Sequence, residues 1–388
     1  MKTFKIIRKF KKPIAVSFLL TFGITCVELV QATPPSPPAA KHIKLGLLLD
    51  TSSSMDGLIS QAQSQLWKIV NELATAKCEG VRPILEIALY EYGNDRLTAS
   101  EGYIRMVTPL TGDLDQISAD LFALTTNGGS EFCGHVIQTA TNQLDWGAGD
   151  EDLKLLFIAG NEPFNQGAVN PVEACTNANV KGIKINTIYC GDFNEGLQSG
   201  WKKGADLAKG HYMSISQNTK TVYISSPYDA QINEMNTALN NTYIPYGKLG
   251  HSKKAMQLSE DANSRSYGAQ NMVSRVMSKN SHVYNNTKWD LVDANKEKDF
   301  DLTKVKKEQL PKEMQTMSIE QRTAHVTKKT DKRTQLNKQL KELSTKRKMF
   351  VAEKKKETGE KAANSLDVAM INAIHAQAKT KNFTFNIN

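Results

Sequence analysis

A carboxylate and two hydroxyls stand at alternate positions in residues 50–54, Asp-Thr-Ser-Ser-Ser, directly after an apolar run over residues 45–49. Such a run is typical of a parallel strand buried on both faces, and open α/β sheets bind ligands at the carboxyl ends of their strands. If the chain turns there, Asp50, Ser52 and Ser54 face one point. These oxygen ligands suit a small hard cation such as Mg²⁺, which keeps several waters. The alternative is a serine-rich turn in which Asp50 caps the following helix.

The elements that must position this segment alternate between strand and helix patterns. Strands are expected over residues 43–50, 84–92, 102–110, 153–159, 183–189 and 211–215. Helical spacing of apolar residues is found over 58–76, 114–124, 134–144, 171–181, 200–208 and 230–239. This alternation predicts an α/β fold with a doubly wound, mostly parallel central sheet and helices on both faces.

Residues 50–54 resemble the first loop of a von Willebrand factor type A domain, whose metal-ion-dependent adhesion site begins with the pattern DxSxS. The resemblance covers about Ile43 to Gly247 and implies a Rossmann-like fold in which two more loops complete the metal site. In the matching second loop, residues 125–134, no threonine stands in the family's place, and the oxygen donors on offer are Ser130 and Glu131. In the third loop Gly160 takes the place of the usual aspartate. Its substitutes, direct or through water, are Asn161 and Glu162.

The resemblance implies adhesion or protein binding, in which an acidic side chain of a partner protein fills the open position of Mg²⁺, Mn²⁺ or Ca²⁺. If Glu131 is a ligand, its added charge favours a more tightly held cation such as Ca²⁺. Its alternative role is a helix N-terminal carboxylate that interacts with the helix dipole. The sequence contains no GxSxG, HExxH or GxxxxGK[ST] motif, so we expect no enzyme.

Residues 1–32 have the pattern of a signal peptide. Six basic residues precede an apolar stretch, and Val30-Gln31-Ala32 is a small-residue cleavage pattern. The alternatives are an uncleaved membrane anchor and a lipidated Cys26. Residues 33–42 contain four prolines and predict a stiff linker. We therefore expect an exported bacterial protein, periplasmic, secreted or on the cell surface, with no transmembrane span after cleavage.

Four cysteines remain after cleavage, and an even number in an exported chain predicts two disulfides with three connectivities. Cys175 is expected in a helix and Cys190 at the end of the following strand, so we favour the pair Cys175–Cys190. Elimination then leaves Cys78–Cys133. A zinc site is the rival, but the spacings are wide and no CxxC occurs.

Residues 248–388 form a predicted helical and basic extension beyond the domain of residues 43–247. The chain carries a net charge of +9, and residues 301–361 alone hold 18 basic and 9 acidic side chains. Helices are expected over 255–277 and 366–378, and a long one from a capping box at Ser318 to about Glu357, with Gly359 as its stop. Phe383-Thr384-Phe385 is expected to pack back on the domain.

The long helix has a short coiled-coil-like seam formed by Leu336, Leu340, Leu343, Arg347 and Phe350. The seam fits a homodimer, a helix pair or packing against the preceding segment. Its lysines could bind an anionic envelope component or simply face solvent. We expect no nucleic acid partner, since an exported chain without a known reading module does not meet one. The alternative function is a structural envelope protein that assembles through this helix and whose metal site is degenerate.

Overall fold

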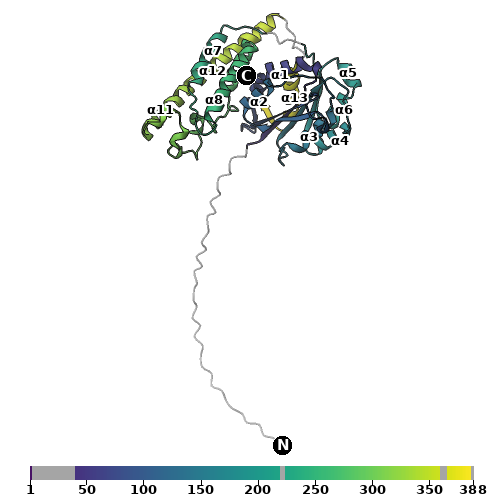
Figure 1. The fold of residues 1–388 in the computed structure, drawn as a ribbon, viewed down its shortest axis with the longest axis horizontal. Coiled ribbons are helices and arrows are strands. Elements are labelled where there is room, and N and C mark those ends of the chain that lie inside the picture. Colours follow the sequence, from purple (N-terminus) through teal and green to yellow (C-terminus); the bar gives the residue numbers. More distant parts are fainter. Residues whose placement is uncertain (2–39, 219–222, 359–364, 386–388) are drawn as a thin grey trace. The chain divides into compact units, whose positions relative to one another are not determined.

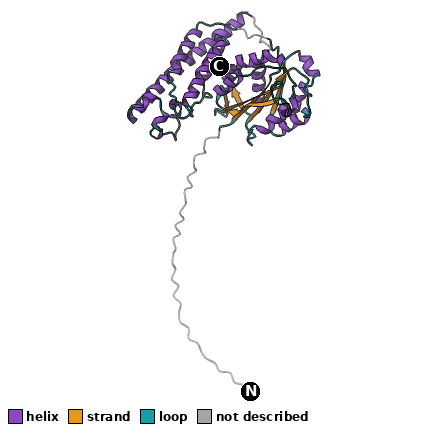
Figure 2. Cartoon of the chain, in the orientation of Figure 1, coloured by secondary structure: helices purple, strands orange, loops and turns teal. Residues whose placement is uncertain are grey.

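The computed structural model describes Met1 and residues 40–218, 223–358 and 365–385. The predicted signal peptide and most of the linker fall on residues 2–39, outside the described residues. A six-stranded sheet of order β4-β3-β1-β5-β6-β7 forms the centre (Figures 1 and 2). Its strands are β1 (His42–Asp50), β3 (Ile84–Tyr92), β4 (Ile104–Thr111), β5 (Leu153–Gly160), β6 (Lys184–Tyr189) and β7 (Tyr212–Ser214).

Neighbouring strands run parallel except at the edge, where β4 is antiparallel to β3. β1 lies between β3 and β5 and is buried from Ile43 to Asp50. Its side chains point alternately to two apolar cores, Leu47 and Leu49 to one and Leu48 to the other. Burial on both faces explains the continuous apolar run, and the predicted α/β fold is confirmed.

Helices cover both faces of the sheet (Figure 2). On one face lie α1 (Asp56–Leu73) and α2 (Leu114–Phe122). On the other face lie α3 (Cys133–Gln143), α4 (Pro171–Val180) and α6 (Trp201–Leu207). Smaller elements in this part are η1 (Ser53–Met55), β2 (Ala76–Cys78), η2 (Ala99–Glu101) and α5 (Phe193–Gln198).

Several of the C-terminal helices pack on the same face as α1, and two short ones belong to a separate small core that contains Leu291, Val292 and Met314. The C-terminal helices are α7 (Asp229–Asn240), α8 (Gly250–Ser266), α9 (Ala269–Lys279), α10 (Leu291–Ala294), α11 (Lys312–Gln315), α12 (Ile319–Thr358) and α13 (Leu366–Lys379). Two short turns, η3 (Leu302–Lys304) and η4 (Lys307–Gln309), precede α11. The single helix expected over residues 255–277 is divided into α8 and α9 at Gly268, whose φ is +106°.

The last described segment completes the sheet region. α13 lies along α1 and β5, and the side-chain amides of Gln377 and Asn186 on β6 form two hydrogen bonds of 2.6 and 3.1 Å. Strand β8 (Phe383–Phe385) then pairs antiparallel with β2, so this segment packs back on the domain as expected, through a strand pairing that the sequence did not predict. From Ala40 onward the chain forms one compact unit, so the extension is not a separate body.

The long helix α12 begins with the predicted capping box. Ser318 N–H donates to Gln321 Oε1 at 2.8 Å, and Gln321 N–H donates to Ser318 Oγ at 3.3 Å. The leucines of the seam, Leu336, Leu340 and Leu343, are buried in the same core as α7 and α9. Of the three arrangements that the seam fitted, packing within the chain is the one found. The predicted stop, Gly359, lies outside the described residues.

The disulfide prediction is wrong: Cys78, Cys133, Cys175 and Cys190 are buried free thiols. Cys78 and Cys190 belong to the core on one face of the sheet, and Cys133 and Cys175 to the core on the other. Each expected pair would therefore have to cross the sheet. The sequence argument neglected the alternation of side chains along a strand, which turns Cys190 away from the face that α4 covers.

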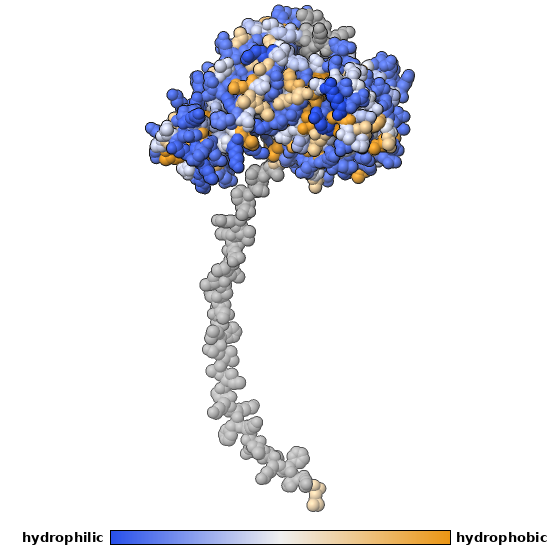
Figure 3. Space-filling model, in the orientation of Figure 1, coloured by the Kyte–Doolittle hydropathy of each residue, from blue (hydrophilic) through white to orange (hydrophobic). Residues whose placement is uncertain are grey.

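The face shown in Figure 3 is mainly hydrophilic, with apolar residues gathered in small groups. None of the helices in the described part of the chain is long and apolar enough to cross a membrane.

Candidate metal site

The carboxyl end of β1 brings the three oxygen donors of the first loop together. Asp50 is its last residue and is completely buried, and its Oδ1 accepts a hydrogen bond of 2.7 Å from Ser52 N–H. The turn η1 places Ser54 Oγ 3.2 Å from Ser52 Oγ. Thr51 points elsewhere, with its Oγ1 3.3 Å from the Tyr92 carbonyl oxygen. The structure therefore brings Asp50, Ser52 and Ser54 close together, and their role as metal ligands stays a prediction.

The second loop brings Glu131 onto Asp50. Glu131 is buried, and its carboxylate lies close enough to Asp50 for its charge to raise the pKa of that residue. Two glycines allow this approach. A Cβ on Gly93 would lie 2.7 Å from Glu131 Cγ and 2.9 Å from Asp50 Oδ1, and a Cβ on Gly129 would lie 2.0 Å from the Gly93 carbonyl oxygen. Ser130 precedes Glu131 and is half-buried, but it is Glu131 that meets Asp50.

Both carboxyl groups are poorly compensated by the chain itself. Burial, followed by the charge of Glu131, raises the pKa of Asp50 well above its usual value. Burial also raises the pKa of Glu131, with a contribution from the charge of Glu162. Asp50 Oδ2 and Glu131 Oε2 have no hydrogen-bond partner among the described residues. Two facing buried carboxylates with unpaired oxygens cost free energy unless a cation or a proton lies between them.

The third loop explains why glycine stands where the resemblance implied an aspartate. A Cβ on Gly160 would lie 2.5 Å from Tyr92 Oη and 3.0 Å from Asp50 Oδ2. The Tyr92 hydroxyl donates to the Ala159 carbonyl oxygen at 3.0 Å, so the tyrosine is held in the space that a side chain at position 160 would need. An aspartate at this position is therefore excluded unless Tyr92 moves.

Of the two proposed substitutes, Asn161 reaches the first loop. Asn161 Nδ2 donates to Ser54 Oγ at 3.2 Å. The Glu162 carboxylate instead accepts a hydrogen bond of 3.2 Å from Gln166 Nε2, although its charge acts on Glu131. Asn161 is thus placed to contribute an oxygen ligand. Glu162 is placed to act on the site through its negative charge.

This donor set fits a hard divalent cation. It combines two carboxylates, two hydroxyls and one amide, and Mg²⁺, Mn²⁺ and Ca²⁺ all favour such oxygen ligands. A cluster of three or more His, Cys, Asp or Glu side chains suited to a metal does not occur among the described residues. The two unpaired carboxylate oxygens are the observation that favours a cation at this place.

Three residues around the site were missed by the sequence reasoning. The sequence predicts that a strand ends at Tyr92 and that a turn begins at Gly93. It does not predict that both residues lie against Asp50, because this contact joins distant segments. Asn94 is buried, and its Nδ2 donates to the Thr125 carbonyl oxygen at 2.8 Å, which ties the second loop down. An Asn after Gly at a strand end was the available signal.

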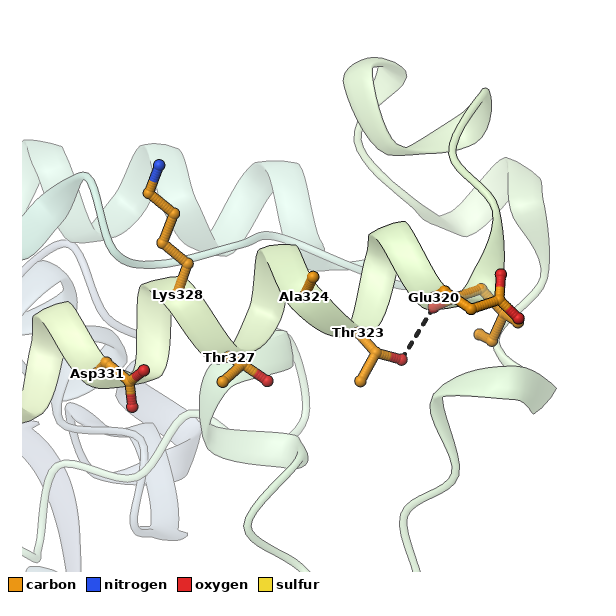
Figure 4. Close-up of a pocket in the computed structure, with 7 residues that line it drawn as sticks. Glu320, Thr323, Ala324, Thr327, Lys328 and Asp331 are labelled. Carbon is orange, nitrogen blue, oxygen red and sulfur yellow. Dashed lines mark hydrogen bonds between the residues drawn. The ribbon is translucent and has the colours of Figure 1, made fainter.

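Apart from the candidate metal site, a hollow of about 760 Å³ runs along the N-terminal part of α12 (Figure 4). All of its lining residues belong to this one helix, and they point to different sides of it. The hydroxyl of Thr323 donates to the Ile319 carbonyl oxygen of the same helix at 2.9 Å. No facing acidic pair occurs among these lining residues, so the geometry of the β1 edge remains the better candidate site.

No family model and no curated protein matches the sequence. Solved structures similar to this chain include the VWA domain of SpRpn10, with 16% identity over 45% of this chain and 88% of that one, and a TM-score of 0.34. BatB from Bacteroides thetaiotaomicron is 16% identical over 45% of this chain and 90% of that one, with a TM-score of 0.35. Proximal thread matrix protein 1 from the mussel byssus, whose MIDAS motif holds zinc, is 14% identical over 46% of this chain and 43% of that one, with a TM-score of 0.34.

Proposed function

We propose that this chain is an exported, metal-ion-dependent protein-binding module of the adhesion type. The observation that carries the proposal is the pair of facing carboxylates of Asp50 and Glu131, each buried with one unpaired oxygen. They lie beside the hydroxyls of Ser52 and Ser54 at the carboxyl end of the central strand. This arrangement costs free energy in the isolated chain and becomes favourable once a cation is bound.

Asp50, Ser52, Ser54 and Glu131 would hold the ion, with Asn161 directly or through water. The bound cation would supply a Lewis-acidic position for an oxygen ligand from outside. Ser54 is exposed, so one side of the site is open to a partner. Because the remaining donors are hard oxygens, we propose that this outside ligand is an acidic side chain of a protein.

Calorimetric titration of residues 40–388 with Mg²⁺, Mn²⁺ and Ca²⁺ tests the site. The expected result is saturable binding of at least one cation with one site per chain. Asp50→Ala should abolish binding, because it removes the central carboxylate. Glu151→Gln, an exposed carboxylate before β5, is the matched control and should bind as the native chain does.

Absence of saturable binding by the native chain would contradict the proposal. The variant Glu131→Gln decides between the two roles of Glu131. A weakened affinity identifies it as a ligand, and an unchanged affinity returns it to the role of a helix N-terminal carboxylate.

The assembly function proposed as an alternative would have to use a different part of α12 than the seam. Leu336, Leu340 and Leu343 are buried within the same chain, so they offer no surface to a second copy. Binding of an anionic envelope component by the exposed lysines of α12 stays a prediction, and retention of such binding after chelation would separate it from the metal-dependent function.

A further inference from the structure

A hollow of about 380 Å³ is lined by residues of the third loop, the start of α4 and the α5–α6 region. Its apolar walls come from Pro163, Phe164, Pro171, Val172 and Leu207, and Lys203 contributes a cationic side chain. This size suits one or two ring side chains rather than a whole cofactor. The open rim includes Val172, which is 36% exposed.

The floor of the hollow is built by aromatic packing on a glycine face of α6. Phe164 and the fully buried Trp201 are in edge contact, with ring centroids 5.1 Å apart. A Cβ on Gly204 would lie 2.4 Å from Phe164 Cε1, so the ring fits only because that residue is glycine. Gly200, one turn earlier, also lines the hollow. The floor is therefore formed by rigid groups that need little rearrangement to receive a side chain.

The hollow and the metal site share one loop. Asn161 contacts Ser54 at the metal site, and Phe164, three residues later, lines the hollow. Three residues span at most about 11 Å. Hydrogen bonds hold the loop from behind, one of 2.8 Å from Trp201 Nε1 to the Glu162 carbonyl oxygen and one of 2.9 Å from Phe164 N–H to the Ser199 carbonyl oxygen.

We propose that this hollow takes an apolar side chain, best an aromatic one, from the same protein ligand whose carboxylate completes the metal site. The inference rests on the proposed function. Both parts of the surface are on one loop, so an extended ligand segment with an acidic residue and an aromatic residue two to four positions apart reaches both. Lys203 at the hollow complements a further acidic residue of that segment. Burying a ring in a preformed apolar hollow is the usual anchor of a protein interface.

The hollow is tested first without any metal. N-acetylphenylalanine amide is titrated into residues 40–388 while the methyl resonances of Val172 and Leu207 are followed by NMR. We expect saturable shifts in the native chain and equally in Asp50→Ala, because the hollow does not need the cation. The Leu207 shifts should be lost in Ser199→Trp, which fills the hollow, and weakened in Val172→Asp, which makes its rim polar.

The matched control is Val180→Asp, an 80% exposed valine at the other end of α4, which should behave as the native chain. No saturable shift in the native chain, or shifts that survive both Ser199→Trp and Val172→Asp, would overturn the proposal. Val172 is already partly exposed, so the second variant is expected to fold even if the first does not.

The link to the metal is tested with two peptides, acetyl-Asp-Gly-Gly-Phe-amide and acetyl-Asp-Gly-Gly-Ala-amide, each in Mg²⁺ and in chelator. In Mg²⁺ the phenylalanine peptide should bind about tenfold more tightly, and Val172→Asp should remove this advantage. Equal affinities of the two peptides in Mg²⁺ would overturn the proposed anchor while leaving the metal function standing. Failure of the metal titration, by contrast, would remove the proposed function and leave the NMR result on the hollow intact.

Discussion

Two groups of buried acidic side chains differ in how their charges are compensated. One lies at the end of β1 and the other lies between α2, α8 and α9. In the second group, fully buried Arg275 pairs with Asp115 and with Asp261, and Lys279 pairs with Asp261 at 3.0 Å. The amides of Asn236 and Asn240 donate to Asp261 at 2.8 and 2.7 Å. Within the described residues, the unpaired buried atoms include Asp50 Oδ2 and Glu131 Oε2 but none from this network.

The pKa of the acid is lowered in one group and raised in the other, because the charges beside the two acids have opposite signs. Burial alone would raise the pKa of Asp261, but Lys279 and Arg275 lower it below its usual value. Burial raises the pKa of Asp50, and the neighbouring charge of Glu131 raises it further. The comparison teaches that burial by itself does not mark a functional carboxylate. The structural carboxylate of Asp261 is paired with cationic side chains of the same chain. Asp50, where we expect an ion from outside, has an acidic neighbour instead.

The largest effect is expected in the paired network. Asp261→Asn removes the carboxylate that faces both Arg275 and Lys279 and leaves buried positive charge uncompensated, so the free energy of unfolding should fall by about 3–5 kcal/mol. Chemical denaturation followed by circular dichroism measures this. Asp192→Asn, on the surface at the start of α5, is the control. A loss below about 1 kcal/mol would mean that the network is not structural.

The same substitution at the metal site should act in the opposite direction. In chelator, Asp50→Asn removes one of two facing carboxylates, and we expect the free energy of unfolding to rise by about 1–3 kcal/mol. With a binding cation at a hundred times its dissociation constant, the native chain should gain about 2.7 kcal/mol, and Asp50→Asn should gain none. Destabilisation of Asp50→Asn in chelator would show that this carboxylate is structural and would end the contrast between the two groups.

The effect of pH on stability is the smallest of the three when it is expressed per pH unit. Burial lowers the pKa of Lys279 from 10.5 to about 7, although Asp261 partly opposes the shift. Between these values the unfolded chain holds a proton that the folded chain has released, so stability rises with pH in this window. Relative to Lys279→Met, the native chain should gain up to about 1.4 kcal/mol per pH unit between pH 7 and 9. Parallel pH profiles of the two chains would contradict the shift.

Much of the fold followed from local patterns. The apolar runs at residues 45–49 and 155–159 predicted two central parallel strands, and the capping box at Ser318 predicted the start of a 40-residue helix. These features are local because strand burial and helix capping involve residues close in sequence. The short turn of residues 50–54 likewise made the convergence of Asp50 with Ser52 and Ser54 predictable.

Other features depended on contacts between distant segments. The pairing of β8 with β2 and the packing of α13 against β5 and β6 join residues about 200 to 300 positions apart, so no local pattern could indicate that the extension completes the sheet region. The positions of the cysteines on opposite faces of the sheet depended on strand orientation in the same way.

The sequence by itself determined the elements of this protein and the oxygen donors at the end of its central strand, because periodicity, capping and turn chemistry act over a few residues. Only the tertiary structure decided that Glu131, rather than Ser130, meets Asp50, and that Tyr92 takes the space an aspartate at position 160 would need. Those outcomes depend on how closely three loops pack around one carboxylate, and that packing is decided by glycines whose neighbours lie far away along the chain.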